Sequence, residues 1–255
     1  MYAVIGGEHR SLARASHRHA GWARMRLMNN EPIDPRWPRL LSLAVHEFRT
    51  PITVVAGYLR MVLKERVGPI SDQQRKLLEE AEKSCGRLSA LVAEMSDLSA
   101  LEAGNAPLNS AGVDLSTVLR GAISALQDLP DREVAVVLEG ADSPLTMPGD
   151  AARLQAAMGS LVAALRREVV TSDRLIVRVT REGRDPMYVI TVAGADQIDS
   201  VAAAATSSLS RFDEWRGGSG LSLAIARRVI GQHGGAVFGA PGEEKAGAVI
   251  LLPSR

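Results

Sequence analysis

The feature that most constrains this 255-residue chain is a run of apolar residues spaced alternately three and four positions apart. The run consists of Leu41, Val45, Phe48, Ile52, Val55, Leu59 and Val62. This spacing places its members along one side of an α-helix, as a seam that packs against other helices. His46 and Glu47 fall outside the seam, so we expect another molecule to reach both side chains.

A second amphipathic helix is predicted directly after the first. The first helix is predicted over residues 35–66, because the Gly-Pro pair at 68–69 opposes its continuation. Residues 71–74 match a capping box, which opens a second helix that ends near residue 103. One hairpin cannot bury its own apolar stripe, whereas two hairpins paired in a four-helix bundle can. We therefore predict a homodimer formed through residues 35–104.

After a Gly, Asn, Pro and Ser-rich linker, the period of the apolar residues changes and a second domain is predicted over residues 113–255. Strands are predicted at 113–115, 134–138, 175–180, 187–192, 236–239 and 248–252. A turn at 183–185 is predicted to join the third and fourth of these strands. Helices are predicted at 116–126, 150–169, 201–211 and 220–232. Helices alternating with a mostly antiparallel sheet indicate an α/β sandwich. The predicted fold class is α+β, with the dimeric helical hairpin followed by this sandwich.

Composition and charge limit the partners and the cellular location expected for the chain. The net charge of +1 gives no overall attraction to nucleic acid, and no apolar run approaches the length of a transmembrane segment. We expect a cytoplasmic protein, in agreement with a single cysteine, Cys85, which is more often core filler than a reactive thiol. Residues 1–34 form a basic segment, either a solvated tail, which is the commoner case, or a contact for a membrane surface, nucleic acid or an acidic partner.

The hexapeptide His-Glu-Phe-Arg-Thr-Pro at residues 46–51 resembles the H-box of bacterial two-component histidine kinases. The resemblance implies that His46 accepts a phosphoryl group on an imidazole nitrogen and passes it to an aspartate of a response regulator. A lone helical histidine is usually an ordinary surface residue, but six consecutive matching residues favour the phosphoacceptor. Neutral imidazole is a nucleophile near pH 7, and Glu47 is its proton-handling neighbour.

The same segment also matches the family's E-x-x-T phosphatase pattern. In that pattern the hydroxyl of Thr50 orients a water molecule against the aspartyl phosphate of the regulator. The alternative is that Thr50 bonds only to the backbone of its own helix.

The segment Gly-Gly-Ser-Gly-Leu-Ser-Leu-Ala at 217–224 resembles the second glycine box of the same family. Glycines lack Cβ and let backbone N–H groups approach a phosphate at the start of the following helix. Gly218, Gly220 and Leu221 are therefore candidates for a residual phosphate-binding loop, although a glycine-rich helix start is by itself only a turn. The family commonly has a further glycine where Ser222 stands.

Two other nucleotide motifs of the family are altered in this chain. Ser160 and Ala164 stand where the family has two asparagines, the second of which ligates Mg²⁺, and an alanine methyl offers no oxygen. Gly194 stands at the aspartate of the family's D-x-G-x-G motif, which accepts a hydrogen bond from the adenine amine, and the nearest carboxylate is Asp196. The lid region at 199–216 is also shorter than typical. We expect no metal site in the protein and weak or absent ATP binding, so that ATP and Mg²⁺ are cofactors only if the altered site still works.

These observations lead to a two-component signalling protein of the histidine kinase family that exchanges a phosphoryl group between His46 and a response regulator. On this hypothesis the ATP site is degenerate, the protein is a phosphotransferase or pseudokinase, and a phosphatase activity on the regulator stays open. One alternative is an active ATP-dependent autokinase that uses Asp196 and the glycine loop. The other is a non-catalytic scaffold that sequesters a regulator.

Overall fold

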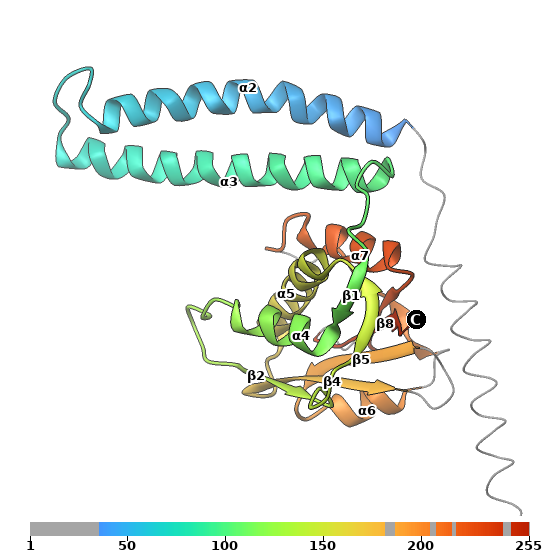
Figure 1. Cartoon of the computed structure of the whole chain (residues 1–255). Helices are drawn as coiled ribbons and strands as arrows, with labels where there is room; N and C mark the ends of the chain where they lie inside the picture. The colour runs from blue at the N-terminus through green and yellow to red at the C-terminus, as the bar shows by residue number, and fades with distance from the viewer. Residues whose placement is uncertain (1–35, 182–186, 205–207, 216–217, 242–245, 255) are drawn as a thin grey trace, which may run out of the picture. The chain divides into compact units, whose positions relative to one another are not determined.

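The protein is described here from a computed structural model, which describes residues 36–181, 187–204, 208–215, 218–241 and 246–254 (Figure 1). The chain divides into two compact units. One contains Ile33–Pro107 together with Gly220–Ile225, and the other contains Leu108–Ser219 and Ala226–Arg255. The basic segment predicted at 1–34 and the turn predicted at 183–185 lie outside the described residues.

The first helix, α2, spans Trp37–Leu63, which confirms the predicted helix to within a few residues at each end. Its seam divides into two faces. Leu41 and Val45 are buried against the rest of the hairpin, whereas Phe48 and Val55 are 52% and 50% exposed. The exposed members of the seam therefore do not pack within the single hairpin.

The second helix, α3, spans Asp72–Glu102 and runs antiparallel to α2 (Figure 1). The predicted capping box is confirmed: Ser71 Oγ accepts from the backbone N–H of Gln74 at 3.2 Å, and Gln74 Oε1 accepts from the N–H of Ser71 at 2.8 Å. Cys85 is buried in the hairpin, where its thiol lies 3.6 Å from the carbonyl oxygen of Ile52.

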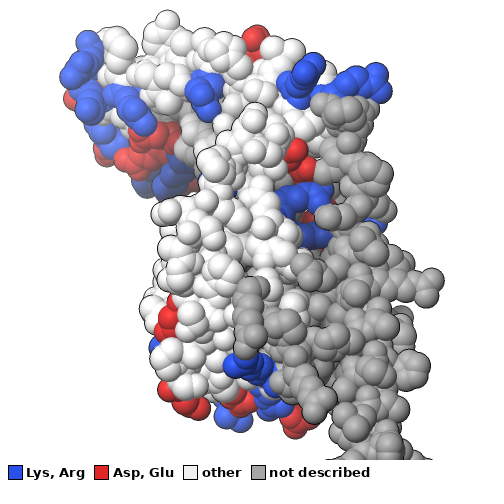
Figure 2. Space-filling model, turned by 45° about the vertical axis from the view of Figure 1, so that its right-hand side comes forward, with Lys and Arg blue, Asp and Glu red and all other residues white. Residues whose placement is uncertain are grey.

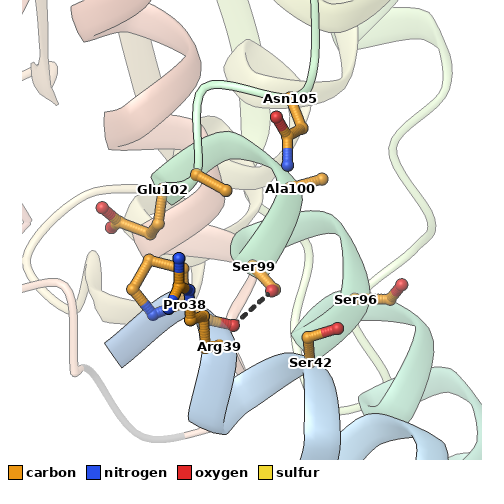
Figure 3. A pocket seen from close by; sticks show the side chains of 9 residues that line it. Pro38, Arg39, Ser42, Ser96, Ser99, Ala100, Glu102 and Asn105 are labelled. Atoms are coloured by element: carbon orange, nitrogen blue, oxygen red, sulfur yellow. Dashed lines mark hydrogen bonds between the residues drawn. The ribbon is translucent and has the colours of Figure 1, made fainter. Parts of the chain in front are cut away.

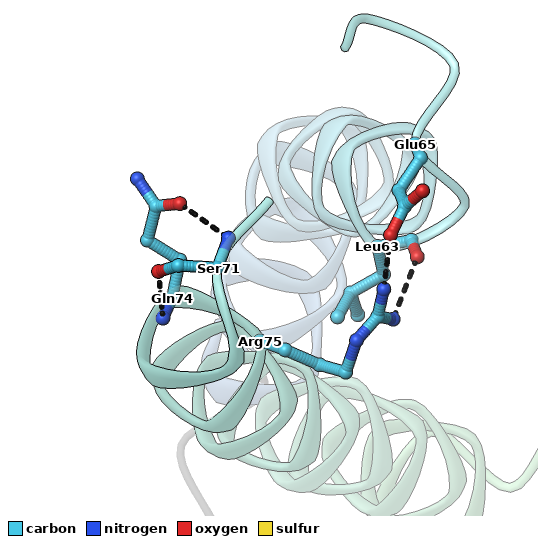
Figure 4. A network of polar contacts seen from close by, with 5 residues as sticks. All are labelled: Leu63, Glu65, Ser71, Gln74 and Arg75. Atoms are coloured by element: carbon cyan, nitrogen blue, oxygen red, sulfur yellow. Dashed lines mark hydrogen bonds and ion pairs between the residues drawn. The ribbon is translucent and has the colours of Figure 1, made fainter. Parts of the chain in front are cut away.

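The turn between the two helices is held by Arg75 (Figure 4). Its Nη1 donates to the carbonyl oxygen of Leu63 at 3.1 Å, and its Nη2 is paired with the carboxylate of Glu65. Glu65 has a φ of 54°, a left-handed conformation that is unfavourable for a residue with a side chain. The guanidinium therefore clamps a strained position of the turn.

The C-terminal unit is built on a six-stranded sheet of order β2-β4-β5-β8-β7-β6. The strands are β1 (Ala111–Asp114), β2 (Ala135–Glu139), β3 (Thr146–Gly149), β4 (Arg174–Arg181), β5 (Met187–Gly194), β6 (Ser210–Arg211), β7 (Ala236–Gly239) and β8 (Ala248–Pro253). The helices are α4 (Leu115–Ser124), α5 (Ala151–Glu168), α6 (Ile198–Ala203) and α7 (Ser222–Gln232). Strand β2 pairs in parallel with β4, and the other neighbours in this sheet are antiparallel. Helices α4 and α5 lie on one side of the sheet and α6 on the other (Figure 1). The predicted fold of a helical hairpin followed by an α/β sandwich is thereby confirmed.

Strands β1 and β3 form a separate antiparallel pair, and the sequence analysis missed β3. Helix α4, predicted to begin at residue 116, begins one residue earlier, at Leu115. The cap is Asp114, whose carboxylate accepts from the Ser116 and Thr117 hydroxyls and from the N–H groups of Ser116 and Leu145. These hydrogen bonds, those from the two hydroxyls first, hold the pKa of the Asp114 carboxyl well below its ordinary value.

The helix predicted at 201–211 is confirmed only over its first residues. Helix α6 ends at Ala203, and Ser210 and Arg211 instead form the edge strand β6, paired with Gly239 and Phe238 of β7. A Cβ atom on Gly239 would lie only 2.5 Å from Ser210 Oγ, so the glycine lets the two strands approach. Pairing with β7 therefore sets the conformation of Ser210 and Arg211, whereas Ala202 and Ala203 remain in α6.

None of the described helices is both long enough and apolar enough to cross a bilayer. On the face shown in Figure 2, acidic and basic side chains of the described residues lie interspersed. Surface ion pairs of the hairpin, Arg60 with Glu82 at 3.4 Å and Lys83 with Glu80 at 2.8 Å, show the same mixing of signs.

Candidate functional site

His46 lies in the third turn of α2 and its side chain is exposed. Successive residues of an α-helix are rotated by about 100°, so His46 points away from the inner face marked by Leu41 and Val45. The side chains of Glu47 and Thr50 are exposed as well. The structure therefore presents all three residues of the predicted H-box site to solvent.

Within this site, Thr50 is a closer neighbour of His46 than Glu47 is. Side chains at i and i+4 share a helix face, whereas those at i and i+1 diverge. Among the described contacts, none joins His46 to Glu47, and the hydroxyl of Thr50 makes no hydrogen bond. The backbone bond typical of a helical threonine is made instead by Thr53, whose Oγ1 donates to the carbonyl oxygen of Arg49 at 2.8 Å.

Pro51 lies inside α2, which continues through it without a break. A proline has no N–H, so the carbonyl oxygen of Glu47 loses its usual helical donor. The backbone acceptor that lacks this donor lies one residue after His46.

A broad apolar surface extends along the exposed side of α2 and onto α3. Its exposed members on α2 are Trp37, Leu40, Leu43, Phe48, Val54, Val55, Tyr58 and Met61, and those on α3 are Leu77, Leu88 and Leu91. On a helical projection, the mean direction of these α2 side chains lies about 120° from the direction of the His46 side chain. An unpartnered apolar stripe of this extent is typical of a helix that packs against another chain.

A polar hollow of about 690 Å³ lies where α2 begins and α3 ends (Figure 3). It is lined by Pro38, Arg39, Ser42, Ser96, Ser99, Ala100, Glu102, Ala103 and Asn105. Ser99 Oγ donates to the carbonyl oxygen of Pro38 at 2.9 Å and ties the two helix ends together. The hollow ends one helical turn before His46, but Figure 3 shows its side chains spread apart rather than converging on one point.

In the C-terminal unit, α5 carries the positions of the two family asparagines. Asp150 caps this helix by accepting from the N–H of Arg153 at 3.1 Å, and that bond is the main cause of its lowered carboxyl pKa. Ser160 is half-buried and Ala164 is only 2% exposed. No group of three or more metal-ligating side chains of His, Cys, Asp or Glu occurs among the described residues. At the position that the resemblance assigns to the second asparagine, Ala164 offers a methyl group and no oxygen.

The glycine-rich loop has the backbone conformation that glycine permits. Gly218 and Gly220 have φ values of 78° and 55°, and the side chain of Leu221 is half-buried. Ser219 between the glycines is 8% exposed, and its Oγ accepts from Arg167 Nη2 at 2.8 Å. No motif in the sequence predicted this contact between the loop and the last turn of α5.

His233, directly after α7, ties the end of that helix to the start of α5. Its Nε2 accepts from the N–H of Asp150 at 2.9 Å, so the proton resides on Nδ1, which donates to the carbonyl oxygen of Val229 at 2.7 Å. Both ring nitrogens of this buried histidine are thereby engaged, which gives it a structural role.

The altered first glycine box forms a tight turn at the end of β5. The N–H of Gln197 donates to the carbonyl oxygen of Gly194 at 2.9 Å, and the side chain of Asp196 folds back over the turn. A Cβ atom placed on Gly194 would lie 2.7 Å from Asp196 Oδ1. The sequence analysis separated these residues by two positions, whereas the structure brings the carboxylate to the backbone of residue 194.

A largely buried ion pair joins two residues that flank the glycine-rich loop in the sequence. Arg227 Nη1 and Glu214 Oε2 are 3.0 Å apart, and the two side chains are 8% and 13% exposed. Because the partners are separated along the chain and neither belongs to a motif, sequence reasoning missed them.

Comparison with known proteins places the hairpin in a family. Residues 38–104 match the His Kinase A (phospho-acceptor) domain. The chain is 32% identical over 206 residues to "Probable sensor histidine kinase TcrY" of Mycobacterium tuberculosis, an alignment covering 76% of this chain and 41% of TcrY. It is 26% identical over 202 residues to "Circadian input-output histidine kinase CikA" of Synechococcus elongatus, covering 76% and 27%. The chain thus spans less than half the length of these relatives.

Solved structures show the same fold. Full-length ShkA in complex with AMPPNP has a TM-score of 0.59 and 23% identity, with 84% of this chain and 45% of ShkA covered. The histidine kinase AdeS of Acinetobacter baumannii has a TM-score of 0.51 and 17% identity, with 82% and 98% covered. Together with the exposed His46 of the matched domain, these comparisons show that the chain belongs to the sensor histidine kinase family, with a His Kinase A phospho-acceptor domain followed by a kinase-like domain.

Proposed function

We propose that this protein carries a phosphoryl group on His46 and exchanges it with the aspartate of a response regulator receiver domain. The observation that supports the proposal best is that His46 lies within the matched domain with its side chain exposed, off the buried face marked by Leu41 and Val45. In the exchange, an imidazole nitrogen attacks the phosphorus of the aspartyl phosphate. The N–P bond forms as the acyl P–O bond breaks, and the aspartate leaves as a carboxylate.

The neighbours of His46 are assigned roles within this proposal. Thr50, on the same face and without a backbone bond of its own, is placed to orient water for hydrolysis of the regulator's aspartyl phosphate. The side chains of Glu47 and His46 point in different directions around the helix. We therefore propose that Glu47 accepts the imidazole proton only when a bound receiver domain covers the site.

The apolar surface of the hairpin supports a homodimer. Eight exposed large apolar side chains on α2 and three on α3 leave the hairpin with a face that water solvates poorly. Packing two hairpins into a four-helix bundle removes this face from water and leaves His46 outside.

We further propose that ATP-dependent autophosphorylation is weak or lost. Metal-assisted transfer of the γ-phosphoryl group depends on a cation bridging the phosphates, and the buried methyl group of Ala164 cannot hold one. Exchange with a receiver domain needs no metal ligand from this chain.

The test offers the purified chain two phosphoryl donors in parallel, labelled ATP with Mg²⁺ and a labelled, phosphorylated receiver domain. We expect acid-labile label from the receiver and not from ATP, on the wild type and not on the His46→Ala variant. Thr50→Ala, with Thr50→Ser as its matched control, tests the water-orienting role through the rate at which the regulator loses phosphate.

The same experiment separates the alternatives. An active autokinase is favoured by the carboxylate of Asp196 beside Gly194, and by the nucleotide analogue in the related ShkA structure; it predicts label from ATP that depends on His46. A scaffold that sequesters a regulator predicts no label from either donor and a His46→Ala variant that binds the regulator normally.

A further inference from the structure

We propose that the start of α7 competes with a second copy of the chain for one end of the apolar surface of the hairpin. The segment Gly220–Ile225 belongs to the same compact unit as the hairpin. The proposal rests on the homodimer proposed above and adds a condition to it. Two hairpins pair along their whole length only when the start of α7 has left this surface.

The first observation is an apolar cluster to which three helices contribute. Leu41 of α2, Leu98 of α3 and Ala224 of α7 are buried together, and Met95 and Ile225 pack against them. Removing these side chains from water stabilises the contact. The start of α7 is therefore a packing partner of the hairpin.

The second observation is the place at which the exposed apolar residues of the hairpin stop. Leu41 and Phe48 are seven positions apart on α2, and Leu91 and Leu98 are seven positions apart on α3, so each pair shares a helix face. Leu41 and Leu98, which lie in the cluster with Ala224, are buried, whereas Phe48 and Leu91 are exposed. The apolar surface is thus covered at one end by α7 and left open along the rest.

The third observation is a polar contact beside this cluster. Glu94 Oε2 accepts from the backbone N–H of Leu221 at 3.0 Å. Backbone N–H groups at the start of a helix have no helical acceptor, and the positive end of the helix dipole favours a carboxylate. A half-buried carboxylate of the hairpin therefore satisfies a backbone donor at the start of α7.

The fourth observation is the close approach that Gly220 permits. A Cβ atom at this position would lie 2.9 Å from Glu94 Oε2 and 3.3 Å from Leu91 Cδ2. The φ of 55° also suits glycine better than a residue with a side chain. Leu91 belongs to the exposed apolar surface, so the chain at Gly220 meets this surface where its open part begins.

These contacts place two occupants on one surface. A four-helix bundle buries the apolar surface of each hairpin along its whole length, including the end that α7 covers. A chain competent to pair only when α7 is released has an apparent affinity lowered by the fraction of released chains, and a dimer needs two such chains. Loss of the hydrogen bond between Glu94 and Leu221 is expected to raise that fraction about 10-fold.

The test measures the contact and the dimer separately in the full chain. Hydrogen–deuterium exchange reports the release of the Leu221 amide, and sedimentation equilibrium gives the dissociation constant of the dimer. Glu94→Ala is expected to speed exchange of this amide about 10-fold and to lower the dissociation constant about 10- to 100-fold. The matched control is Glu79→Ala, which removes an exposed acid of the same helix and is expected to change neither quantity.

Two further variants separate release of α7 from a direct change of the dimer surface. Ile225→Glu places a charge in the apolar cluster from the side of α7 and is expected to have the same two effects as Glu94→Ala, with the hairpin itself unaltered. Phe48→Glu combined with Glu94→Ala is expected to be monomeric with a rapidly exchanging Leu221 amide. Circular dichroism melting checks that each variant is folded.

The proposal is overturned if the Leu221 amide exchanges in Glu94→Ala as slowly as in the wild type. It is overturned alone if both releasing variants dimerise only as tightly as the wild type, and together with the homodimer if the wild type and every variant are monomeric. His46→Ala is expected to match the wild type in both measurements, so failure here and failure of the exchange at His46 are distinguishable.

Discussion

The hairpin and the C-terminal unit, each taken by itself, hold their functional residues in different ways. His46 stands on an exposed helix face, and its position depends on the helix alone. The C-terminal unit instead joins segments that are distant in sequence, through contacts such as that of Arg167 in α5 with Ser219 of the glycine-rich loop. A site on one helix is readable from a short motif, whereas contacts between distant segments are not.

The largest expected effect is on the free energy of unfolding, through a polar contact inside the C-terminal unit. Arg227→Met leaves the carboxylate of Glu214 buried without its partner, so we expect a loss of about 3–5 kcal/mol in the free energy of unfolding. Urea denaturation followed by circular dichroism measures it. The double variant with Glu214→Leu removes both charges and is expected to recover much of the loss; no recovery would contradict the pairing.

The second prediction concerns the apolar face of the hairpin. Phe48→Glu places a charge in the proposed bundle interface, and Phe48 is already 52% exposed in one chain, so we expect the dimer to dissociate while the hairpin stays helical. Light scattering coupled to size-exclusion chromatography measures the mass. The matched control is Arg49→Glu, next to it on the polar side, which is expected to remain dimeric. A dimeric Phe48→Glu variant would place the interface elsewhere.

The third prediction uses the cap of α4. Asp114→Ala is expected to cost about 1–2 kcal/mol at neutral pH, because the helix loses its N-cap. The carboxyl pKa of Asp114 is lowered in the folded state, so its contribution is present above the unfolded aspartate pKa of about 4 and is lost as the pH falls further. Asp114→Asn, which keeps the cap without the charge, is expected to show a flatter decline of unfolding free energy on acidification. An unchanged pH profile would contradict this assignment.

The smallest expected effect is at the hairpin turn. Arg75→Ala removes the donor to the Leu63 carbonyl oxygen and the partner of Glu65, for an expected loss of about 0.5–1.5 kcal/mol. Glu65→Gly relieves the positive φ and is expected to be neutral or slightly stabilising in the Arg75→Ala background. Thermal melting of both variants measures this, and a Glu65→Gly variant that melts well below its parent would refute the strain.

Local signals predicted most of the fold. The capping box and the Gly-Pro stop delimit the hairpin, and alternating apolar residues marked most strands of the sheet. The sequence did not reveal β3, a four-residue strand interrupted by Pro148, or the pairing that turns Ser210 and Arg211 into an edge strand. Those outcomes depend on neighbours distant in sequence, which a window of local propensities does not contain.

The residues of the candidate site also fall into those that the sequence predicted and those whose contacts only the structure shows. His46, Glu47 and Thr50 were predicted because their motif is contiguous. The contact of Asp196 with Gly194 depends on the geometry of a turn, and that of Arg167 with Ser219 joins residues 52 positions apart. Neither contact is visible in the sequence as a spacing of residues.

The most direct test of the central claim is tandem mass spectrometry of the wild-type chain after incubation with a phosphorylated receiver domain, under neutral conditions that preserve phosphoramidates. The account predicts a phosphoryl group on His46 that is stable in base and lost in acid. An acid-stable phosphate on another residue, or an unmodified His46 while the receiver remains phosphorylated, would contradict it.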